Sequence, residues 1–368
     1  MTDRAEPSAY VRLAIAQASG LLPSDRPDAE VIKLNSNENP YPPSPRALAA
    51  LRSIGGESLR RYPDAFADEF RRAVSAELDV PPDWILVTNG GDALIDLLVR
   101  ACTDRDRPIV FPDPTYPLYG HLAPLQESRA IPVPFLPSLD LDAAKFAANF
   151  PLERLVEQRG ALTFVANPNS PTGHVLPLAT LRQLAENVAG ILAIDEAYID
   201  FTDAKSAIEL VREFDNAIVL RTLSKGYGLA GLRLGFGVAN PALLAELWKV
   251  RPVYAIDAIS ARVGAAAIAD RVYKVARVRS ICQTRDGFAK FLADRGFAVW
   301  PSGGNFLLVR PPERFGSARS LHEALRARQI WVRHYDSSRL KDKLRVTIGT
   351  EAQMSQVLGA IDAISKST

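Results

Sequence analysis

Four polar segments in the middle of the chain carry residue types that could do chemistry, and each of them follows a short apolar run. They are Asn89-Gly90-Gly91-Asp92, Asn167-Pro-Asn-Ser-Pro-Thr-Gly173, Asp195-Glu-Ala-Tyr198 and Arg221-Thr-Leu-Ser-Lys-Gly226. Two glycines ahead of a helix expose backbone N–H groups to an anion. The other segments supply amide and hydroxyl groups, a carboxylate followed by a tyrosine, and a lysine beside hydroxyls.

A lysine, a carboxylate and an anion cradle are together what a pyridoxal phosphate enzyme requires. The amine of Lys225 can form a Schiff base, and the carboxylate of Asp195 can keep a pyridine nitrogen protonated while the other donors hold a phosphate. Each segment alone has a plainer explanation, since a glycine pair can form a simple turn and a lone lysine is usually a solvated surface group. The prediction therefore depends on the combination.

A parallel sheet covered by helices would bring these segments together. Short apolar runs alternate with helical patterns, which predicts buried strands at residues 85–88, 109–111, 162–166, 191–194, 217–220 and 234–238. Leucines on one face predict helices at residues 93–101 and 178–188. Ligands of open parallel sheets bind beyond the carboxyl ends of the strands, so we expect all four segments at one edge.

From about residue 270 the pattern changes to that of a smaller α/β domain. A helix containing Phe288, Phe291 and Leu292 stops at Gly296. Strands are then expected at residues 297–300, 305–309, 330–333 and 344–348, with a helix at 318–328 and another at the end of the chain. Near the start, the proline-rich residues 39–45 predict irregular backbone.

Length and composition exclude several classes of protein. The 368 residues correspond to about two domains, and the formal charge of +2 argues against a nucleic-acid partner. The two cysteines, Cys102 and Cys282, lie far apart, which excludes a disulfide framework and a zinc knuckle. No apolar run approaches the ~18 residues of a membrane span. We expect a soluble, cytoplasmic protein with no metal and no membrane contact.

Six motifs resemble those of the histidinol-phosphate aminotransferase family. They are Leu34-Asn-Ser-Asn-Glu-Asn-Pro-Tyr41, Arg61-Tyr-Pro-Asp64, the 167–173 and 195–198 segments, Ser224-Lys-Gly-Tyr-Gly-Leu-Ala-Gly-Leu-Arg-Leu-Gly235 and Arg345-Val-Thr-Ile-Gly-Thr350. The resemblance implies the α/β fold of fold type I enzymes, with a mixed, mostly parallel seven-stranded sheet between helices and a smaller α/β domain. The expected bounds are 40–265 for the large, cofactor-binding domain, and 1–39 with 266–368 for the small one.

The same resemblance implies pyridoxal 5′-phosphate as cofactor and assigns residues to it. Lys225 would form the Schiff base and move the substrate proton, Asp195 would pair with the pyridine nitrogen, and Tyr198 would meet the phenolic oxygen. Tyr116 would stack on the ring. The phosphate would be bound by Gly90, Gly91, Asp92, Thr222, Ser224 and Arg233, and by Tyr62 of a neighbouring subunit, so that a homodimer shares its active sites.

The implied reaction is a ping-pong transamination from histidinol phosphate to 2-oxoglutarate, in histidine biosynthesis. More broadly, the partners are an amino acid or amino alcohol phosphate and a 2-oxo acid. Arg345 would clamp a substrate carboxylate, Arg333 would meet the distal phosphate, and Tyr41 would also contact substrate. The alternative for Arg333 is a surface cation on an edge strand.

Two departures from the family pattern leave the amino donor open. Ser170 stands where the family usually has an asparagine that bonds the phenolic oxygen, and Asn169 can share this role. Asp257 would repel a phosphorylated substrate unless it is paired. An aromatic amino-acid aminotransferase and an O-phosphothreonine decarboxylase therefore stay open as alternatives.

A nicotinamide-dependent dehydrogenase is a more remote alternative. Residues 226–231 fit the GxGxxG fingerprint of dinucleotide-binding proteins. That fingerprint requires an acid at the end of a second strand, whereas Glu246 falls within the helical pattern of residues 241–250. A dehydrogenase would also leave Lys225 and Arg233 without a role.

Overall fold

A seven-stranded sheet forms the centre of the larger part of the molecule. The computed structural model describes residues 10–20, 30–135 and 149–367. The strand order is β2 (Ile85–Thr88), β8 (Gly235–Ala239), β7 (Ala217–Thr222), β6 (Ile191–Asp195), β5 (Leu162–Ala166), β3 (Ile109–Asp113) and β4 (Ala130–Pro134). Only β8 runs antiparallel to its neighbours, so the predicted mixed, mostly parallel sheet is confirmed.

Six of these strands were predicted, and the edge strand β4 was missed. Its sequence is Ala-Ile-Pro-Val-Pro, and three of the five residues are exposed. Proline cannot donate to a strand ladder and is therefore confined to sheet edges, where the hydrophobic pattern is weak.

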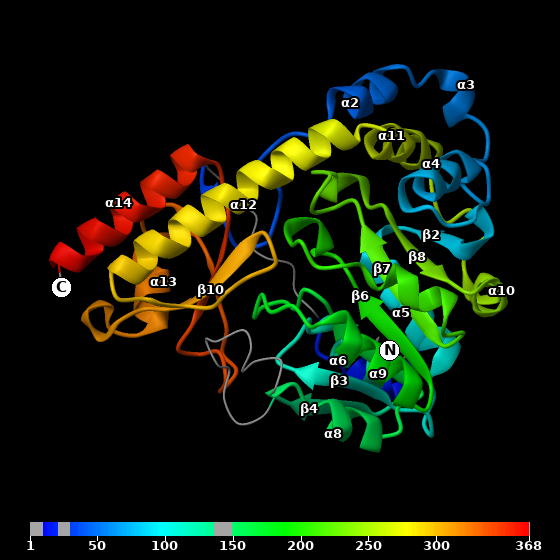
Figure 1. The fold of residues 1–368 in the computed structure, drawn as a ribbon, viewed down its shortest axis with the longest axis horizontal. Coiled ribbons are helices and arrows are strands. Elements are labelled where there is room, and N and C mark those ends of the chain that lie inside the picture. The colour runs from blue at the N-terminus through cyan, green and yellow to red at the C-terminus, as the bar shows by residue number, and fades with distance from the viewer. Residues whose placement is uncertain (1–9, 21–29, 136–148, 368) are drawn as a thin grey trace, which may run out of the picture.

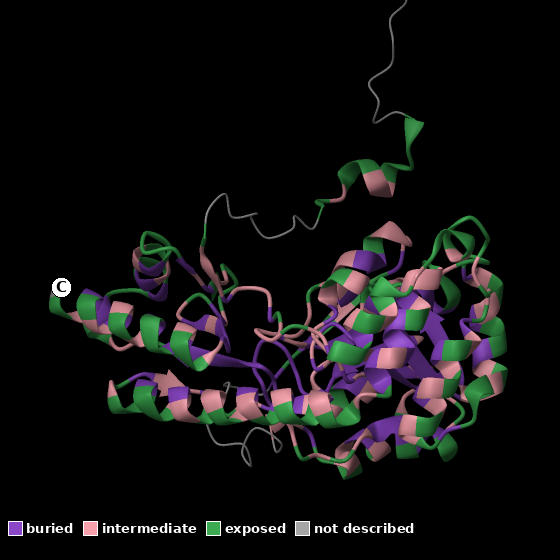
Figure 2. Ribbon diagram, turned by 90° about the horizontal axis from the view of Figure 1, so that it is seen from above, coloured by how far each residue is buried: buried purple, intermediate pink, exposed green. Residues whose placement is uncertain are grey.

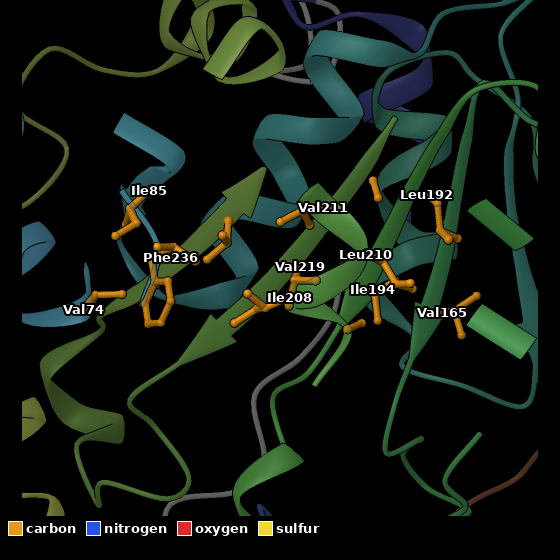
Figure 3. Packing of buried hydrophobic residues seen from close by; sticks show 14 of the residues in the cluster. Val74, Ile85, Val165, Leu192, Ile194, Ile208, Leu210, Val211, Val219 and Phe236 are labelled. Carbon is orange, nitrogen blue, oxygen red and sulfur yellow. The ribbon is translucent and has the colours of Figure 1, made fainter. Parts of the chain in front are cut away.

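Helices cover both faces of this sheet, because the strand side chains alternate between two apolar clusters. Ile194 and Val219 face one cluster, together with Val74 and Phe236, and Figure 3 shows these side chains packed over the strands. Covering this face are α2 (Pro45–Arg52), α4 (Asp68–Leu78), α8 (Leu152–Glu157), α9 (Leu178–Asn187) and α11 (Ala258–Ile268). On the opposite face lie α5 (Gly90–Cys102), α6 (Leu118–Leu125) and α10 (Pro241–Val250).

The smaller part has its own sheet and its own apolar core. Its antiparallel strands are ordered β12 (Arg333–His334), β13 (Leu344–Thr347), β10 (Phe306–Arg310) and β9 (Ala298–Val299). The helices are α12 (Arg271–Asp294), α13 (Ala318–Arg326) and α14 (Glu351–Ser367), and α12 runs from beside α11 along the whole smaller part (Figure 1). The predicted helices, and the strands expected at 297–300, 305–309 and 344–348, are confirmed to within a few residues. The strand expected at 330–333 instead divides into Ile330–Trp331 and Arg333–His334, which belong to different sheets.

Residues 32–34 join the smaller part. β1 (Ile32–Lys33) pairs in parallel with β11 (Ile330–Trp331), and Leu34 is buried in the smaller core. Arg12, by contrast, donates to the Leu125 carbonyl at the end of α6 in the larger part. Residues 1–9 and 21–29 lie outside the described residues. The domain bounds themselves stay a prediction. The two remaining helices near the start are α1 (Leu13–Gln17) and α3 (Gly56–Leu59).

The four polar segments meet at one edge of the large sheet. β2, β5, β6 and β7 run in the same direction, since β2 and β7 are both antiparallel to β8. Thr88 and Thr222 are both register partners of Gly235, which brings the ends of β2 and β7 to either side of β8. Figure 2 shows the strands buried, with the helices exposing only their outer faces.

Several expected absences can be compared with the described part of the chain. No described helix is both long and apolar enough to cross a membrane. Within the described ranges, no three His, Cys, Asp or Glu residues are placed to hold a metal. Residues 226–231 lie between β7 and β8 and overlap only the short 3-10 turn Ala230–Leu232, so the fingerprint does not open a helix as a dinucleotide site requires.

Candidate active site

One cavity of about 600 Å³ lies at the carboxyl edge of the large sheet. It is lined by most of the predicted cofactor residues: Gly91, Asp92, Tyr116, Ser170, Asp195, Tyr198, Thr222, Ser224, Lys225 and Arg233. A second cavity, of about 550 Å³, lies against α12 and is lined by residues such as Asp200, Lys274 and Arg285. Only the first brings together a lysine, an acid at a strand end and an uncapped helix start.

The start of α5 is built to receive an anion. Asn89 precedes the helix but forms no side-chain cap, so the first-turn N–H groups have neither an intrahelical partner nor a side-chain partner among the described residues. Gly90 has a φ of +81°, and a Cβ there would lie 2.6 Å from Nη2 of Arg233. A Cβ on Gly235 would lie 2.7 Å from the carbonyl carbon of Gly90. Glycine at both positions therefore lets the arginine approach the helix start.

Hydroxyl and guanidinium donors complete this cradle. Thr222 Oγ1 donates to Ser224 Oγ over 2.9 Å, and Arg233 reaches Ser224 Oγ at 3.4 Å and Asp92 Oδ2 at 3.1 Å. A forked guanidinium, two hydroxyls and free backbone N–H groups match the acceptor oxygens of a phosphate dianion. The donor set therefore fits the phosphate of the cofactor that the sequence predicts.

Asp195 lies at the end of β6 and is held by two donors. Tyr119 Oη donates to its Oδ2 over 2.7 Å, and the backbone N–H of Ala197 donates to its Oδ1 over 3.0 Å. Burial raises the pKa of the Asp195 carboxyl, and both hydrogen bonds oppose that rise by stabilising the charged form. A carboxylate in this environment gains from a cationic partner such as a protonated pyridine nitrogen.

The sequence interpretation missed Tyr119. Its side chain is fully buried and stacks on Phe164, with ring centroids 4.5 Å apart. Burial, together with the Asp195 charge, raises the pKa of Tyr119, so the phenol stays protonated as a donor. The available signal was its place in the same short segment as Tyr116, whose ring it contacts edge-on at a centroid distance of 5.7 Å.

Tyr116 lies beside the cradle and also serves as a donor. Its hydroxyl donates to Asp92 Oδ1 over 3.0 Å, and its ring meets that of Tyr119 edge-on at 85°. Burial and the nearby Asp92 carboxylate raise the pKa of Tyr116. The ring lines the cavity, as the predicted stacking role requires.

Lys225 and Tyr198 face one another across the cavity. Lys225 Nζ lies 5.7 Å from the centroid of the Tyr198 ring and donates to the carbonyl of Ser36 over 3.3 Å. Tyr198 Oη accepts a bond of 2.9 Å from Nδ2 of Asn37. Ser36 and Asn37 belong to a motif noted in the sequence, but nothing in the sequence indicated these long-range partners.

Ser170 and Asn169 are separated by the fold. Ser170 lines the cavity, whereas Asn169 is buried and its amide donates to the Pro114 carbonyl and the Thr172 hydroxyl over 3.0 and 2.7 Å. The expectation that Asn169 shares the role of contacting the cofactor is therefore not supported, because its side chain holds the surrounding loops. Ser170 is the residue of the pair that reaches the cavity.

Arg345 and Arg333 are brought to directly opposite positions. They are register partners across the β12–β13 ladder, so their side chains share one face of the smaller sheet. Arg345 donates to Ser170 Oγ at 3.2 Å and to the Asn35 carbonyl at 2.8 Å, and its buried Nε has no partner in the described part of the chain. Arg333 is exposed, and its guanidinium lies 5.7 Å from the ring centroid of Tyr335.

Three other singled-out residues do not line the cavity of their own chain. Tyr62 is 81% exposed and stacks on Tyr254, with ring centroids 4.5 Å apart. Tyr41 packs against the Arg277 guanidinium at 5.1 Å. Asp257 caps α11, where its carboxylate accepts from the Ser260 N–H and hydroxyl, so the expected repulsion of a substrate in this cavity has no support.

Comparisons with known proteins agree with this geometry. Residues 29–361 match the family described as aminotransferase class I and II. A histidinol-phosphate aminotransferase 1 from Trichormus variabilis is 48% identical over 346 residues, covering 94% of this chain and 95% of its own. A histidinol-phosphate aminotransferase from Citrifermentans bemidjiense is 39% identical over 95% of this chain and 97% of its own. The crystal structure of histidinol-phosphate aminotransferase from Sinorhizobium meliloti, in complex with pyridoxal-5′-phosphate, has a TM-score of 0.82 at 26% identity and 91% coverage of both chains.

Proposed function

Because the chain belongs to the histidinol-phosphate aminotransferase family, within the class I and II aminotransferases, we propose that it transfers the amino group of histidinol phosphate to 2-oxoglutarate. The protein is a pyridoxal-phosphate-dependent aminotransferase. The observation that carries the choice of substrate is the facing pair Arg333 and Arg345, of which Arg345 bonds Ser170 in the lining of the cavity that contains the lysine, the acid and the phosphate cradle.

Within the cavity, each polar group has a role in binding or in proton transfer. When bound, pyridoxal phosphate supplies a ring that accepts the electron pair left behind as a substrate C–H bond breaks. Asp195 holds the proton of the pyridine nitrogen, and Tyr198 donates to the phenolic oxygen. The helix start at Gly91, with Thr222, Ser224 and Arg233, binds the phosphate.

Lys225 anchors the cofactor and moves the substrate proton. Its amine lines the cavity between Tyr198 and the carbonyl of Ser36, and it forms no ion pair with a carboxylate among the described residues. An amine without a carboxylate partner is available as a nucleophile and general base. Donation to the Ser36 carbonyl fixes the position of the nitrogen in the cavity.

The arginine pair suits an anionic group on the substrate. Like charges directly opposite one another on a sheet are destabilising, and neither guanidinium has an acidic partner among the described residues. A phosphate ester or a carboxylate lying between them would offset that repulsion and accept forked hydrogen bonds. Histidinol phosphate carries such a phosphate and 2-oxoglutarate carries two carboxylates, so one pair can serve both half-reactions.

We also propose a homodimer in which Tyr62 serves the neighbouring active site. Tyr62 lies outside its own cavity and stacks on Tyr254, and both rings are exposed. Phe66, Leu59 and Val253 add to the exposed apolar side chains of this part of the chain. Exposed clusters of large apolar residues mark protein interfaces, and a second copy of the chain is the partner that would use the Tyr62 hydroxyl.

A substrate panel tests this proposal. Histidinol phosphate, phenylalanine, tyrosine and phosphothreonine are offered with 2-oxoglutarate, and we expect histidinol phosphate to have the highest kcat/KM. Preference for an aromatic amino acid, or release of carbon dioxide from phosphothreonine, would refute the choice of substrate.

Variants of the arginines then locate the phosphate site. Loss of charge-assisted hydrogen bonds in Arg333→Ala should lower kcat/KM for histidinol phosphate by roughly 10- to 100-fold, with a smaller effect on phenylalanine. Arg328→Ala is the matched control, since Arg328 is an exposed arginine of the same part whose guanidinium, within the described ranges, bonds only the Ala324 carbonyl. Equal losses for both donors in Arg333→Ala would contradict the role in phosphate binding.

A further inference from the structure

Asn37 connects the two parts of the molecule beside the cavity, which its neighbours Ser36 and Glu38 line. We propose that Asn37 is a positioning residue that sets the direction of the Tyr198 hydroxyl. It lies in the segment between β1 and α2, and it is 1% exposed. Tyr198 follows β6 of the large sheet, 161 residues away. This inference rests on the proposed contact between Tyr198 and the phenolic oxygen of the cofactor.

Every polar group of Asn37 has a partner. Nδ2 donates to Tyr198 Oη over 2.9 Å, while Oδ1 accepts from Thr347 Oγ1 over 2.9 Å. The backbone N–H donates to the same threonine oxygen over 3.0 Å, and the carbonyl accepts from Asn305 Nδ2 over 3.1 Å. Because Thr347 gives its only hydroxyl proton to Oδ1, the amide N–H of Asn37 is left to face Tyr198.

The backbone of Asn37 is held in a conformation that few residues adopt. Its φ is +53°, in the left-handed region where asparagine is the best tolerated residue after glycine. A buried non-glycine residue keeps such a conformation only where its surroundings demand it. Here the surroundings are Thr347 of β13 and Asn305, which immediately precedes β10.

The direction of this hydrogen bond has a chemical consequence. Tyr198 Oη accepts from Asn37, so the hydroxyl is free to direct its own proton into the cavity. Donation to the phenolic oxygen of the cofactor stabilises the anionic form of that oxygen. Asn37 therefore keeps Tyr198 as a donor, although it touches neither cofactor nor substrate itself.

The other groups around Tyr198 are the same in every variant proposed below. The titratable groups that face it are Lys225, Tyr116, Tyr119 and Tyr335. The edge of Phe306, whose ring centroid lies 5.1 Å away at 80°, fixes the plane of the ring. Phe306 and Thr347 both belong to the smaller sheet, so the orientation of Tyr198 depends on both parts of the chain.

The test is a spectrophotometric pH titration of the holoenzyme, which reports the pH midpoint of the visible absorption change of the cofactor. Asn37→Asp keeps the shape of the side chain, but a carboxylate can only accept hydrogen bonds. The Tyr198 hydroxyl would then donate to this carboxylate instead of directing its proton to the cofactor. The midpoint should rise by roughly one to two pH units, in the same direction as in Tyr198→Phe. Asn37→Gly removes the amide without strain and should give a smaller rise.

Combining each change with Tyr198→Phe separates the hydrogen bond from other effects. In the Tyr198→Phe background, Asn37→Gly should no longer raise the pH midpoint. Asn37→Asp should raise the midpoint there only by the direct effect of the added negative charge. Thr347→Val, which releases the amide and leaves residue 37 unchanged, should raise the midpoint only when Tyr198 is present. Thr103→Val is the matched control, because Thr103 is a buried threonine whose hydroxyl bonds the Val99 carbonyl.

The outcomes distinguish this inference from the proposed function. If Tyr198→Phe moves the midpoint while the Asn37 and Thr347 variants leave it unchanged, the positioning role is overturned and the assignment of Tyr198 stands. The positioning role is also overturned if the shifts persist undiminished in the Tyr198→Phe background. A midpoint that Tyr198→Phe does not move overturns both assignments.

Discussion

Replacing Tyr119 with phenylalanine should make the binding of pyridoxal phosphate sensitive to pH. The change deletes one hydroxyl and keeps the ring that stacks on Phe164 at 4.5 Å. That hydroxyl donates to Asp195 over 2.7 Å and opposes the rise in pKa that burial imposes on the carboxyl. Without it the pKa of Asp195 rises further, because the charged form loses a donor.

The magnitude follows from the charge on the acceptor. A hydrogen bond to an ionised group is worth about 1.5–3 kcal/mol, which corresponds to roughly 10- to 150-fold in an equilibrium constant. Below the raised pKa, the protonated cofactor must displace a proton from Asp195 before it can pair with the carboxylate. The variant should therefore bind more weakly by about this factor at mildly acidic pH, with a shrinking difference as the pH rises.

Titration of the apoprotein with cofactor between acidic and alkaline pH is the assay. Tyr273→Phe is the matched control, because its hydroxyl donates to the Pro42 carbonyl over 2.9 Å and does not line the cavity. If Tyr119→Phe loses the same factor in affinity at every pH, the hydroxyl acts on shape alone, and the electrostatic reasoning is refuted. An affinity equal to that of the unmodified protein would refute any role for the bond.

Three further predictions concern the cofactor cavity. Lys225→Ala should abolish transamination and fixation of the cofactor by borohydride, while the circular dichroism spectrum stays unchanged; retained turnover would contradict the role of the lysine. Burial raises the pKa of Asp195 in the folded apoprotein above its value in the unfolded chain. The Asp195 carboxyl therefore contributes to stability at a pH below its unfolded-state pKa, and this contribution is lost as the pH rises through the folded-state pKa. Apo Asp195→Asn should therefore melt at a higher temperature than the unmodified apoprotein at pH 7 but not at acidic pH, and an equal melting temperature at pH 7 would argue against this. Gly90→Ala adds a Cβ 2.6 Å from Arg233 at a φ of +81° and should weaken cofactor affinity by roughly tenfold, whereas Gly287→Ala, with open space around it, should not.

Much of the large sheet follows from local pattern. The runs at 109–111, 162–166 and 191–194 are apolar because both faces of a parallel strand are covered by helices, and such strands can be recognised without knowledge of their partners. The edge strand β4 could not be recognised in this way, because its prolines and exposed side chains carry no such pattern.

The cofactor residues at the strand ends were also predictable, because parallel strands place their carboxyl ends at one edge whatever the details of packing. Lys225, Asp195 and the glycines at the start of α5 line or adjoin a single cavity for this reason. Asn169 shows the limit of this reasoning. Ser170 is the next residue of the same loop, so the position in the sequence does not distinguish the two. Only the loop conformation decides which of the two side chains faces the cavity.

By itself the sequence determined the chemistry of this protein: a lysine, an acid and an anion cradle at the ends of parallel strands, with arginines in a second domain. Only the tertiary structure decided which groups orient them. Tyr119 acts on Asp195 across 76 residues and Asn37 meets Thr347 across 310, and contacts between such distant positions depend on how the two sheets are packed. The pairing of Arg333 with Arg345 was likewise decided only by the tertiary structure. A shift of β12 by one residue would place Arg333 on the opposite face of the smaller sheet from Arg345.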